Sequence, residues 1–203
     1  MCSELKEQSK NSSNPPMKKH LITLILIACT SVVYGQFFQL TPIGFIGKID
    51  PTKDYYVVNH SKLSQQELYK KSLIYFNGQF SSPKNVISTV ENESITLNFY
   101  DKYNIIMSSI WNVNMSYTFN FKDGKVKISA PYIVRIFNDN LNTISINKTN
   151  EGNNFPIYKR NDSGELRGSD GLKAKTIIEQ KTNAFVLQYI NHIITDTPKK
   201  DDW

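Results

Sequence analysis

The sequence predicts a fold of the α+β class, a mainly antiparallel sheet of about five strands with two helices packed on one face. Three observations predict it. Apolar residues recur at helical spacing over 65–80 and 172–194, they alternate strictly with polar residues over 113–121, and turn residues separate the strand-like runs between the two helices. The expected order is strand, helix, four strands, helix, and helices on one side of an antiparallel sheet form a two-layer sandwich.

The first 35 residues have the pattern of a secretory signal peptide. Lys18 and Lys19 precede the apolar run 21–28, and Val33-Tyr34-Gly35 offers a small-x-small cleavage site. The apolar run is too short for a membrane-spanning helix, which needs about 20 residues. We therefore expect a leader over 1–35 with its functional start at Met17, cleavage between Gly35 and Gln36, and export to the periplasm or the medium.

A second mode of processing is open at Cys29. Leu26-Ile27-Ala28-Cys29 also fits a bacterial lipobox, in which the cysteine is acylated and becomes the first residue. Each buried CH₂ of an acyl chain contributes about 0.8 kcal/mol, so lipidation would hold the protein on a membrane of the cell envelope. The well-formed site at Gly35 favours the soluble form.

The composition of the remaining chain excludes several classes of protein. Both cysteines, Cys2 and Cys29, lie in the leader, so an ordinary hydrophobic core has to hold the fold without disulfides. The leader also holds four of the 24 basic and two of the 18 acidic residues, which leaves a net charge of +4. This mild excess is scattered along the chain and does not predict nucleic-acid binding.

The domain is expected over 53–195, after an irregular, Pro- and Gly-containing lead-in over 36–52. A short β-prone run, 55–58, comes first. Ser64 and Glu67 then match a capping box, in which each side chain satisfies a backbone N–H of the other residue. The helix that they begin is expected to reach about Phe80. Its inner face is predicted to comprise Leu68, Tyr69, Ser72, Phe76 and Phe80.

Four strands are expected between the helices, over 85–90, 94–100, 113–121 and 125–130. The third is the clearest, because nine residues alternate strictly between apolar and polar types. Asp123-Gly124 is a favoured two-residue hairpin turn and predicts that the third and fourth strands are neighbours.

The last part of the chain is expected to be less regular. A long polar loop is predicted over 138–171, then the closing helix over about 172–194, and a loose tail over 196–203. The apolar face of that helix is expected to comprise Ile178, Phe185, Val186, Tyr189, Ile190 and Ile193.

The chain resembles a family of exported bacterial domains of unknown function described as having a TATA-box-binding-protein-like (TBP-like) fold. The resemblance covers roughly residues 50–136 and the late helix. It implies a secreted α+β domain with no known activity, and a fold name alone does not imply DNA binding. The matching segments are 55–58, 63–69, 80–87 and the alternating strand that ends in Lys122-Asp123-Gly124-Lys125.

Candidate chemistry is sparse. After processing, His60 and His192 are the remaining histidines, and neither has neighbours in the sequence that suit catalysis or metal binding. No catalytic, cofactor-binding or metal-binding residues are therefore predicted. One hypothesis is an enzyme with a dispersed site, in which folding brings a carboxylate to His60 or His192.

The favoured hypothesis is a non-enzymatic envelope module that binds a protein or a small ligand. A membrane would be a partner only if Cys29 is lipidated, as in an anchored protein with a structural role, and the oligomeric state is not predicted. The candidate binding face is the polar side of the third strand, which offers hydrogen bonds but no group that titrates near neutral pH. It comprises Asn114, Ser116, Thr118 and Asn120.

Overall fold

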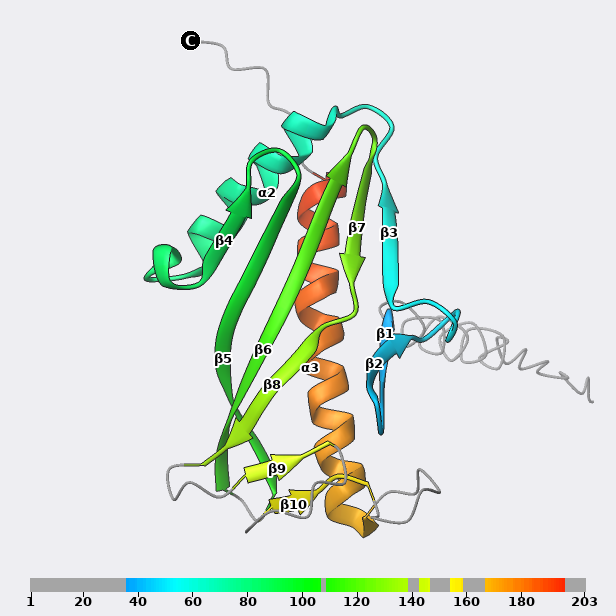
Figure 1. The fold of residues 1–203 in the computed structure, drawn as a ribbon, viewed down its shortest axis with the longest axis vertical. Helices are drawn as coiled ribbons and strands as arrows, with labels where there is room; N and C mark the ends of the chain where they lie inside the picture. The colour runs from blue at the N-terminus through cyan, green and yellow to red at the C-terminus, as the bar shows by residue number, and fades with distance from the viewer. Residues whose placement is uncertain (1–35, 107–108, 139–142, 147–153, 159–166, 196–203) are drawn as a thin grey trace, which may run out of the picture. The chain divides into compact units, whose positions relative to one another are not determined.

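A sheet of eight strands forms the centre of the computed structural model, which describes residues 36–106, 109–138, 143–146, 154–158 and 167–195 (Figure 1). Its strands are β3 (Tyr55–Asn59), β4 (Ile87–Val90), β5 (Ser94–Ile106), β6 (Ser109–Lys122), β7 (Lys125–Ser129), β8 (Tyr132–Phe137), β9 (Thr143–Ser145) and β10 (Asn154–Pro156). The order is β10-β9-β8-β6-β5-β4, with β7 beside β6 and β3 beside β7. Of these pairs, β9 and β10 are parallel and the others antiparallel, so the predicted class is confirmed with more strands than expected.

The long hairpin of β5 and β6 supplies about a third of the buried apolar side chains among the described residues. The predicted alternation in β6 is confirmed: its inward side chains Val113, Met115, Tyr117, Phe119 and Phe121 are at most 3% exposed. Both strands extend beyond their predicted ends, because Tyr103 and Trp111 continue the buried set toward the far end of the hairpin. Burial of these side chains against the helices is the main stabilising contribution in such a layer.

The predicted turn at Asp123-Gly124 is also confirmed. Lys122 pairs with Lys125 across it, and Gly124 has a φ of 67°, in the region that favours glycine. A Cβ on Gly124 would lie 3.3 Å from the Cα of Ser61, so the turn is closely packed as well. The return strand β7 then pairs along its whole length with β3.

Helix α2 (Gln65–Gln79) begins with the predicted capping box. The Glu67 N–H donates to Ser64 Oγ at 3.3 Å, and the Ser64 N–H donates to Glu67 Oε2 at 2.8 Å. The Ser64 N–H and the Ser64 hydroxyl, which donates to Glu67 Oε2 at 2.7 Å, together lower the pKa of Glu67. Asp123 at the hairpin turn accepts from the Gln65 N–H at 2.8 Å, so the helix start is joined to the sheet.

Replacing Ser64 by alanine is expected to lower the free energy of unfolding by about 1 kcal/mol, because one helix N–H loses its acceptor. Urea unfolding followed by circular dichroism measures the change. Ser61→Ala, at an exposed serine outside the helix, is the matched control. Equal losses in the two variants would show that the cap does not stabilise the helix.

Helix α3 (Gly168–Thr195) packs beside α2 on the same face of the sheet (Figure 1). Tyr189 lies at the centre of this contact, with its ring 5.0 Å from that of Phe76 in α2 and 4.6 Å from that of Phe119 in β6. Its hydroxyl and that of Ser72 are 2.8 Å apart. The predicted inner face of the helix is buried, except that Phe185 is only partly so.

The prediction of an irregular lead-in over 36–52 is wrong. β1 (Phe38–Thr41) and β2 (Gly44–Gly47) form an antiparallel hairpin, with a φ of 118° at Gly44 in its turn. The glycines and Pro42 suggested a loop, but short strands between such residues carry too few positions to show alternation. Phe38 and Leu40 are each 1% exposed and belong to the core.

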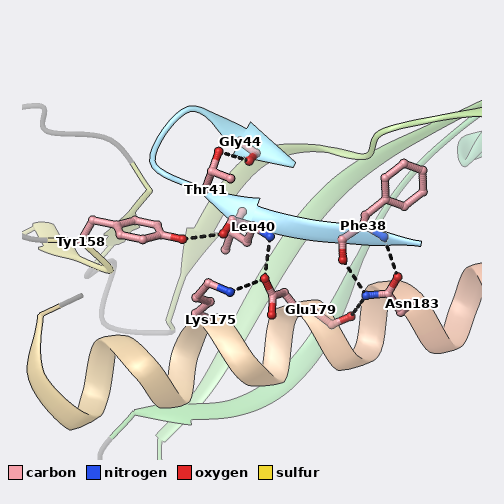
Figure 2. A network of polar contacts seen from close by, with 8 residues as sticks. All are labelled: Phe38, Leu40, Thr41, Gly44, Tyr158, Lys175, Glu179 and Asn183. Carbon is pink, nitrogen blue, oxygen red and sulfur yellow. Dashed lines mark hydrogen bonds and ion pairs between the residues drawn. The ribbon is translucent and has the colours of Figure 1, made fainter. Parts of the chain in front are cut away.

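Side chains from distant elements satisfy the outer edge of β1 (Figure 2). Asn183 Oδ1 accepts from the N–H groups of Phe37 and Phe38 at 2.7 and 3.0 Å, and its Nδ2 donates to the Phe38 carbonyl at 2.9 Å. Glu179, which also pairs with Lys175, accepts from the Leu40 N–H at 2.6 Å. The Tyr158 hydroxyl donates to the Leu40 carbonyl at 2.6 Å, so both outward residues of β1 are fully paired.

The predicted loop over 138–171 also needs correction. It contains β9 and β10, and α3 begins at Gly168, before the predicted start near 172. Ile144, Ile157 and Tyr158 are buried, which ties part of this segment to the core. Strands of three residues are stabilised by their partners, and no periodic pattern marks them in the sequence.

Some expectations fall outside the described residues. These are the leader over 1–35, with Cys29 and Gly35, and the tail over 196–203, whereas Gln36 is the first residue described. Among the described helices, none combines the length and the apolar character needed to cross a membrane.

Candidate functional site

The sheet has one face that neither described helix covers, and we call it the open face. Side chains at odd positions of β6 point to the helices, as the contact between Phe76 and Phe119 shows. The four predicted binding residues, Asn114, Ser116, Thr118 and Asn120, therefore share the open face, where each is partly exposed. Figure 1 looks onto this face, with α3 behind the sheet.

The strand register brings other residues beside these four, because residues directly opposite in a ladder share a face. Asn120 lies between Ser94 of β5 and Lys127 of β7. Ser116 lies between Asn98 of β5 and Tyr132 of β8, and Asn114 between Tyr100 of β5 and Arg135 of β8. The face thus presents short polar side chains in the middle, with long cationic and aromatic ones beside them.

The charges at these outward positions are all positive. The register places five cations there, Lys102, Lys122, Lys125, Lys127 and Arg135. Asp101 lies opposite Val113 and so belongs to the other side of the sheet. Within the described residues, no carboxylate occupies a paired outward position or forms an ion pair with any of the five. We call these five residues the basic set.

Aromatic rings accompany the basic set. Tyr100 is 62% and Tyr132 is 70% exposed, unusually high for side chains of that size. The Lys127 ammonium lies 5.6 Å from the centre of the Tyr55 ring, and the Arg135 guanidinium lies 4.9 Å from that of Phe137. Such cation–π contacts hold long cationic side chains along the sheet surface.

The hydrogen-bonding groups of the open face are suited to binding. The hydroxyls of Thr96 and Thr118 lie 3.2 Å apart, so they satisfy one another across the strands. Asparagine, serine and threonine side chains donate and accept hydrogen bonds without changing charge near neutral pH. The face can therefore hold a complementary surface, but these groups cannot move protons at that pH.

The two histidines lie in different parts of the fold, and His60 borders the basic set, because Asn59 before it lies opposite Lys125. His60 follows β3, and its N–H donates to the Gly124 carbonyl at 2.7 Å. Its Nδ1 is buried and has no hydrogen-bond partner among the described residues. His192, near the end of α3, stacks on Tyr75 with the ring centres 4.5 Å apart. Among the described residues, no carboxylate is therefore hydrogen-bonded to His60 Nδ1.

Two hollows lie near β3, and neither is lined by the four predicted binding residues. One, of about 310 Å³, lies between β3 and residues 47–53. The other, of about 560 Å³, lies at the turn between β6 and β7. Among the described residues, no group of three or more His, Cys, Asp or Glu side chains could hold a metal ion.

The sequence shows only part of this site. Alternation in β6 is enough to place Asn114, Ser116, Thr118 and Asn120 on one face. Lys125 and Lys127 alternate in β7 and could have been added from the hairpin prediction. Arg135 could not, because a register irregularity between Asn114 and Met115 decides which residues of β8 lie outward.

Comparison with known proteins supports the fold. No protein-family model and no curated protein matches the sequence. A TBP-like protein from Parabacteroides distasonis ATCC 8503 is similar in structure over 70% of this chain and 92% of its own, with a TM-score of 0.53 and 10% identity. A DUF4468 family protein from Bacteroides ovatus ATCC 8483 covers 67% of this chain and 84% of its own, with a TM-score of 0.43 and 13% identity. The first similarity shows a TBP-like fold, as the sequence resemblance predicts.

Proposed function

We propose that this chain is an exported, non-enzymatic binding domain that contacts an acidic protein surface through its open face. The observation that carries the proposal is the basic set, five cations on one sheet face without a carboxylate at any paired outward position of the described strands. Complementary charge raises the association rate and selects the partner, while the short polar side chains supply hydrogen bonds.

A macromolecular partner fits this face better than a small ligand. Small molecules bind in concave sites, and of the basic set only Lys125 lines either of the two hollows described above, which Asn114 and Ser116 do not line. Exposed tyrosine and arginine side chains, such as Tyr100, Tyr132 and Arg135, are enriched at protein interfaces. The open face combines these residue types on a rigid sheet.

Export is the second part of the proposal, and the leader pattern supports it. Among the described residues, the first backbone N–H bonded to α3 belongs to Phe37, which follows Gln36, the residue that the proposed cleavage would leave first. Cleavage there would leave the docked edge of β1 intact. Mass spectrometry of the protein exported by its native host is expected to show Gln36 as the first residue. An acylated Cys29 would instead place the domain on a membrane surface.

Reversing two charges on the open face is expected to weaken binding of an acidic polypeptide at least about tenfold. The double variant Lys102→Glu with Arg135→Glu removes two attractive charges and adds two repulsive ones next to Asn112 and Asn114. Fluorescence anisotropy with labelled polyglutamate measures the affinity, which should also fall as salt rises.

The matched control has the same net charge. Lys70→Glu with Lys173→Glu makes the same change at exposed positions of α2 and α3, on the other side of the sheet. An equal loss of polyglutamate affinity in this variant would show that net charge alone causes the effect. Tighter binding of dextran sulfate or of anionic vesicles than of polyglutamate would contradict a protein partner.

A further inference from the structure

Strand β3 forms one edge of the sheet, and β7 is its single partner among the described strands (Figure 1). At one end the Ala130 N–H donates to the Asp54 carbonyl at 2.6 Å, and at the other the His60 N–H donates to the Gly124 carbonyl at 2.7 Å. Hydrogen-bonded pairs alternate along an antiparallel ladder, so the even-numbered residues of β3 face β7. Tyr55, Val57 and Asn59 therefore direct their N–H and C=O groups away from it.

This edge differs from that of β1. There, both outward residues, Phe38 and Leu40, have side-chain partners for their N–H and C=O groups. No such partner reaches the outward groups of Tyr55, Val57 or Asn59 from the described part of the chain. An unpaired row of this kind is a template for another strand.

The edge also has space beside it. The hollow of about 310 Å³ is lined by Tyr55 and Val57 on one side and by Ile49 and Lys53 on the other. Ile49 is 82% exposed and offers an apolar contact. Lys53 forms an ion pair with Asp50 at 2.8 Å, so the charges of these two residues in the wall of the hollow are paired with each other.

The charge next to the edge indicates the chemistry of the added strand. Lys127 lies opposite Val57, and its ammonium lies over the ring of Tyr55 in β3, 5.6 Å from the ring centre. Lys125 lies opposite Asn59 on the same face. A second copy of β3 would bring two more such lysines to that face, and like charges oppose this pairing. Carboxylates on the same face of the added strand would instead attract both Lys125 and Lys127.

Strand β4, which also forms an edge of the sheet, offers less. The Asn98 N–H donates to the Val86 carbonyl, so in β4 the residues that face outward are Ile87 and Thr89. Two residues provide fewer hydrogen bonds than the three of β3, and the basic set does not extend to β4.

We propose that β3 accepts an extended, acidic segment of another protein as an added strand, held by the outward groups of Tyr55, Val57 and Asn59. Main-chain hydrogen bonds supply affinity in such complexes, and alternate side chains supply specificity. This site lies at the sheet edge, shares Lys125 and Lys127 with the basic set of the proposed function, and does not use Asn114 or Ser116.

The test uses the full chain and a blocked heptapeptide that alternates glutamate and valine. Binding should shift the amide NMR signals of Tyr55, Val57 and Asn59. Val57→Pro removes one outward N–H and leaves the ladder to β7 intact, so it should weaken binding about tenfold. Val57→Thr keeps the N–H and is the matched control. Lys127→Gln should weaken binding several-fold and reduce its salt dependence.

Two peptide variants test the same point on the unaltered chain, in case Val57→Pro does not fold. Methylating the backbone nitrogens of all glutamates, or of all valines, blocks one edge of the peptide at a time. Loss of binding with one series alone supports strand addition, and equal binding of both overturns it. A dimer of the full chain that Val57→Pro dissociates would identify a second copy as the occupant and overturn the acidic partner. Shifts at Asn114 and Ser116 instead of at β3 would assign the peptide to the open face and overturn the edge site.

Discussion

Replacing Asn183 by leucine is expected to lower the free energy of unfolding by roughly 3 kcal/mol or more. The variant leaves three backbone groups of Phe37 and Phe38 without partners, two of them buried, and each such group costs about 1–3 kcal/mol. Urea unfolding measures the change. Asn183→Asp keeps the acceptor and loses the donor to the Phe38 carbonyl. Its free energy of unfolding should therefore lie between that of the unaltered chain and that of Asn183→Leu.

The control for this prediction is Gln188→Leu. It makes the same kind of change, amide to leucine, at an exposed position of the same helix. Its free energy of unfolding should stay within about 0.5 kcal/mol of the unaltered chain. If the two leucine variants were equally stable, the docking of β1 through Asn183 would contribute nothing to the fold.

Raising the pH above 10 is expected to destabilise the domain steeply. Burial raises the pKa of Tyr117 and Tyr189, and it raises the pKa of Tyr158 to about 12. In the unfolded chain each hydroxyl loses its proton near pH 10, whereas in the folded chain it stays neutral. The stabilisation is therefore complete below pH 10 and is lost as the pH rises toward the folded values. Each of the three contributes a fall of about 1.4 kcal/mol per pH unit.

Unfolding by urea at several pH values between 8 and 11 tests this slope. Tyr189→Phe keeps the ring contacts with Phe76 and Phe119 and removes one ionisable hydroxyl. The Ser72 hydroxyl still donates to the Leu68 carbonyl at 2.7 Å, so no buried group is left unpaired. Below pH 10 the two slopes should agree, and above pH 10 the slope of the variant should become shallower, by up to about 1.4 kcal/mol per pH unit. Identical slopes would mean that Tyr189 ionises as readily in the folded chain as in the unfolded one.

Local signals in the sequence determined the elements whose cause is local. The capping box of Ser64 and Glu67 lies within one helical turn, and the Asp123-Gly124 turn is complete in two residues. Period-2 alternation over nine residues of β6 was enough to separate its buried side from the side with Asn114 and Ser116. These features predict the class of the fold, the buried faces of both helices and four residues of the open face.

Tertiary structure decided what depends on partners distant in the sequence. The edge of β1 is satisfied by Asn183 and Glu179, which lie about 140 residues further along the chain, so 36–52 looks irregular when read alone. The strands β9 and β10 are too short to show a period and exist through their pairing, and a register irregularity interrupts the alternation of β8. The basic set is complete only when the register places Lys102 and Arg135 beside β6. Side-chain spacing along a chain carries no information about register between strands, and it is this register that makes a charged face and an unpaired edge.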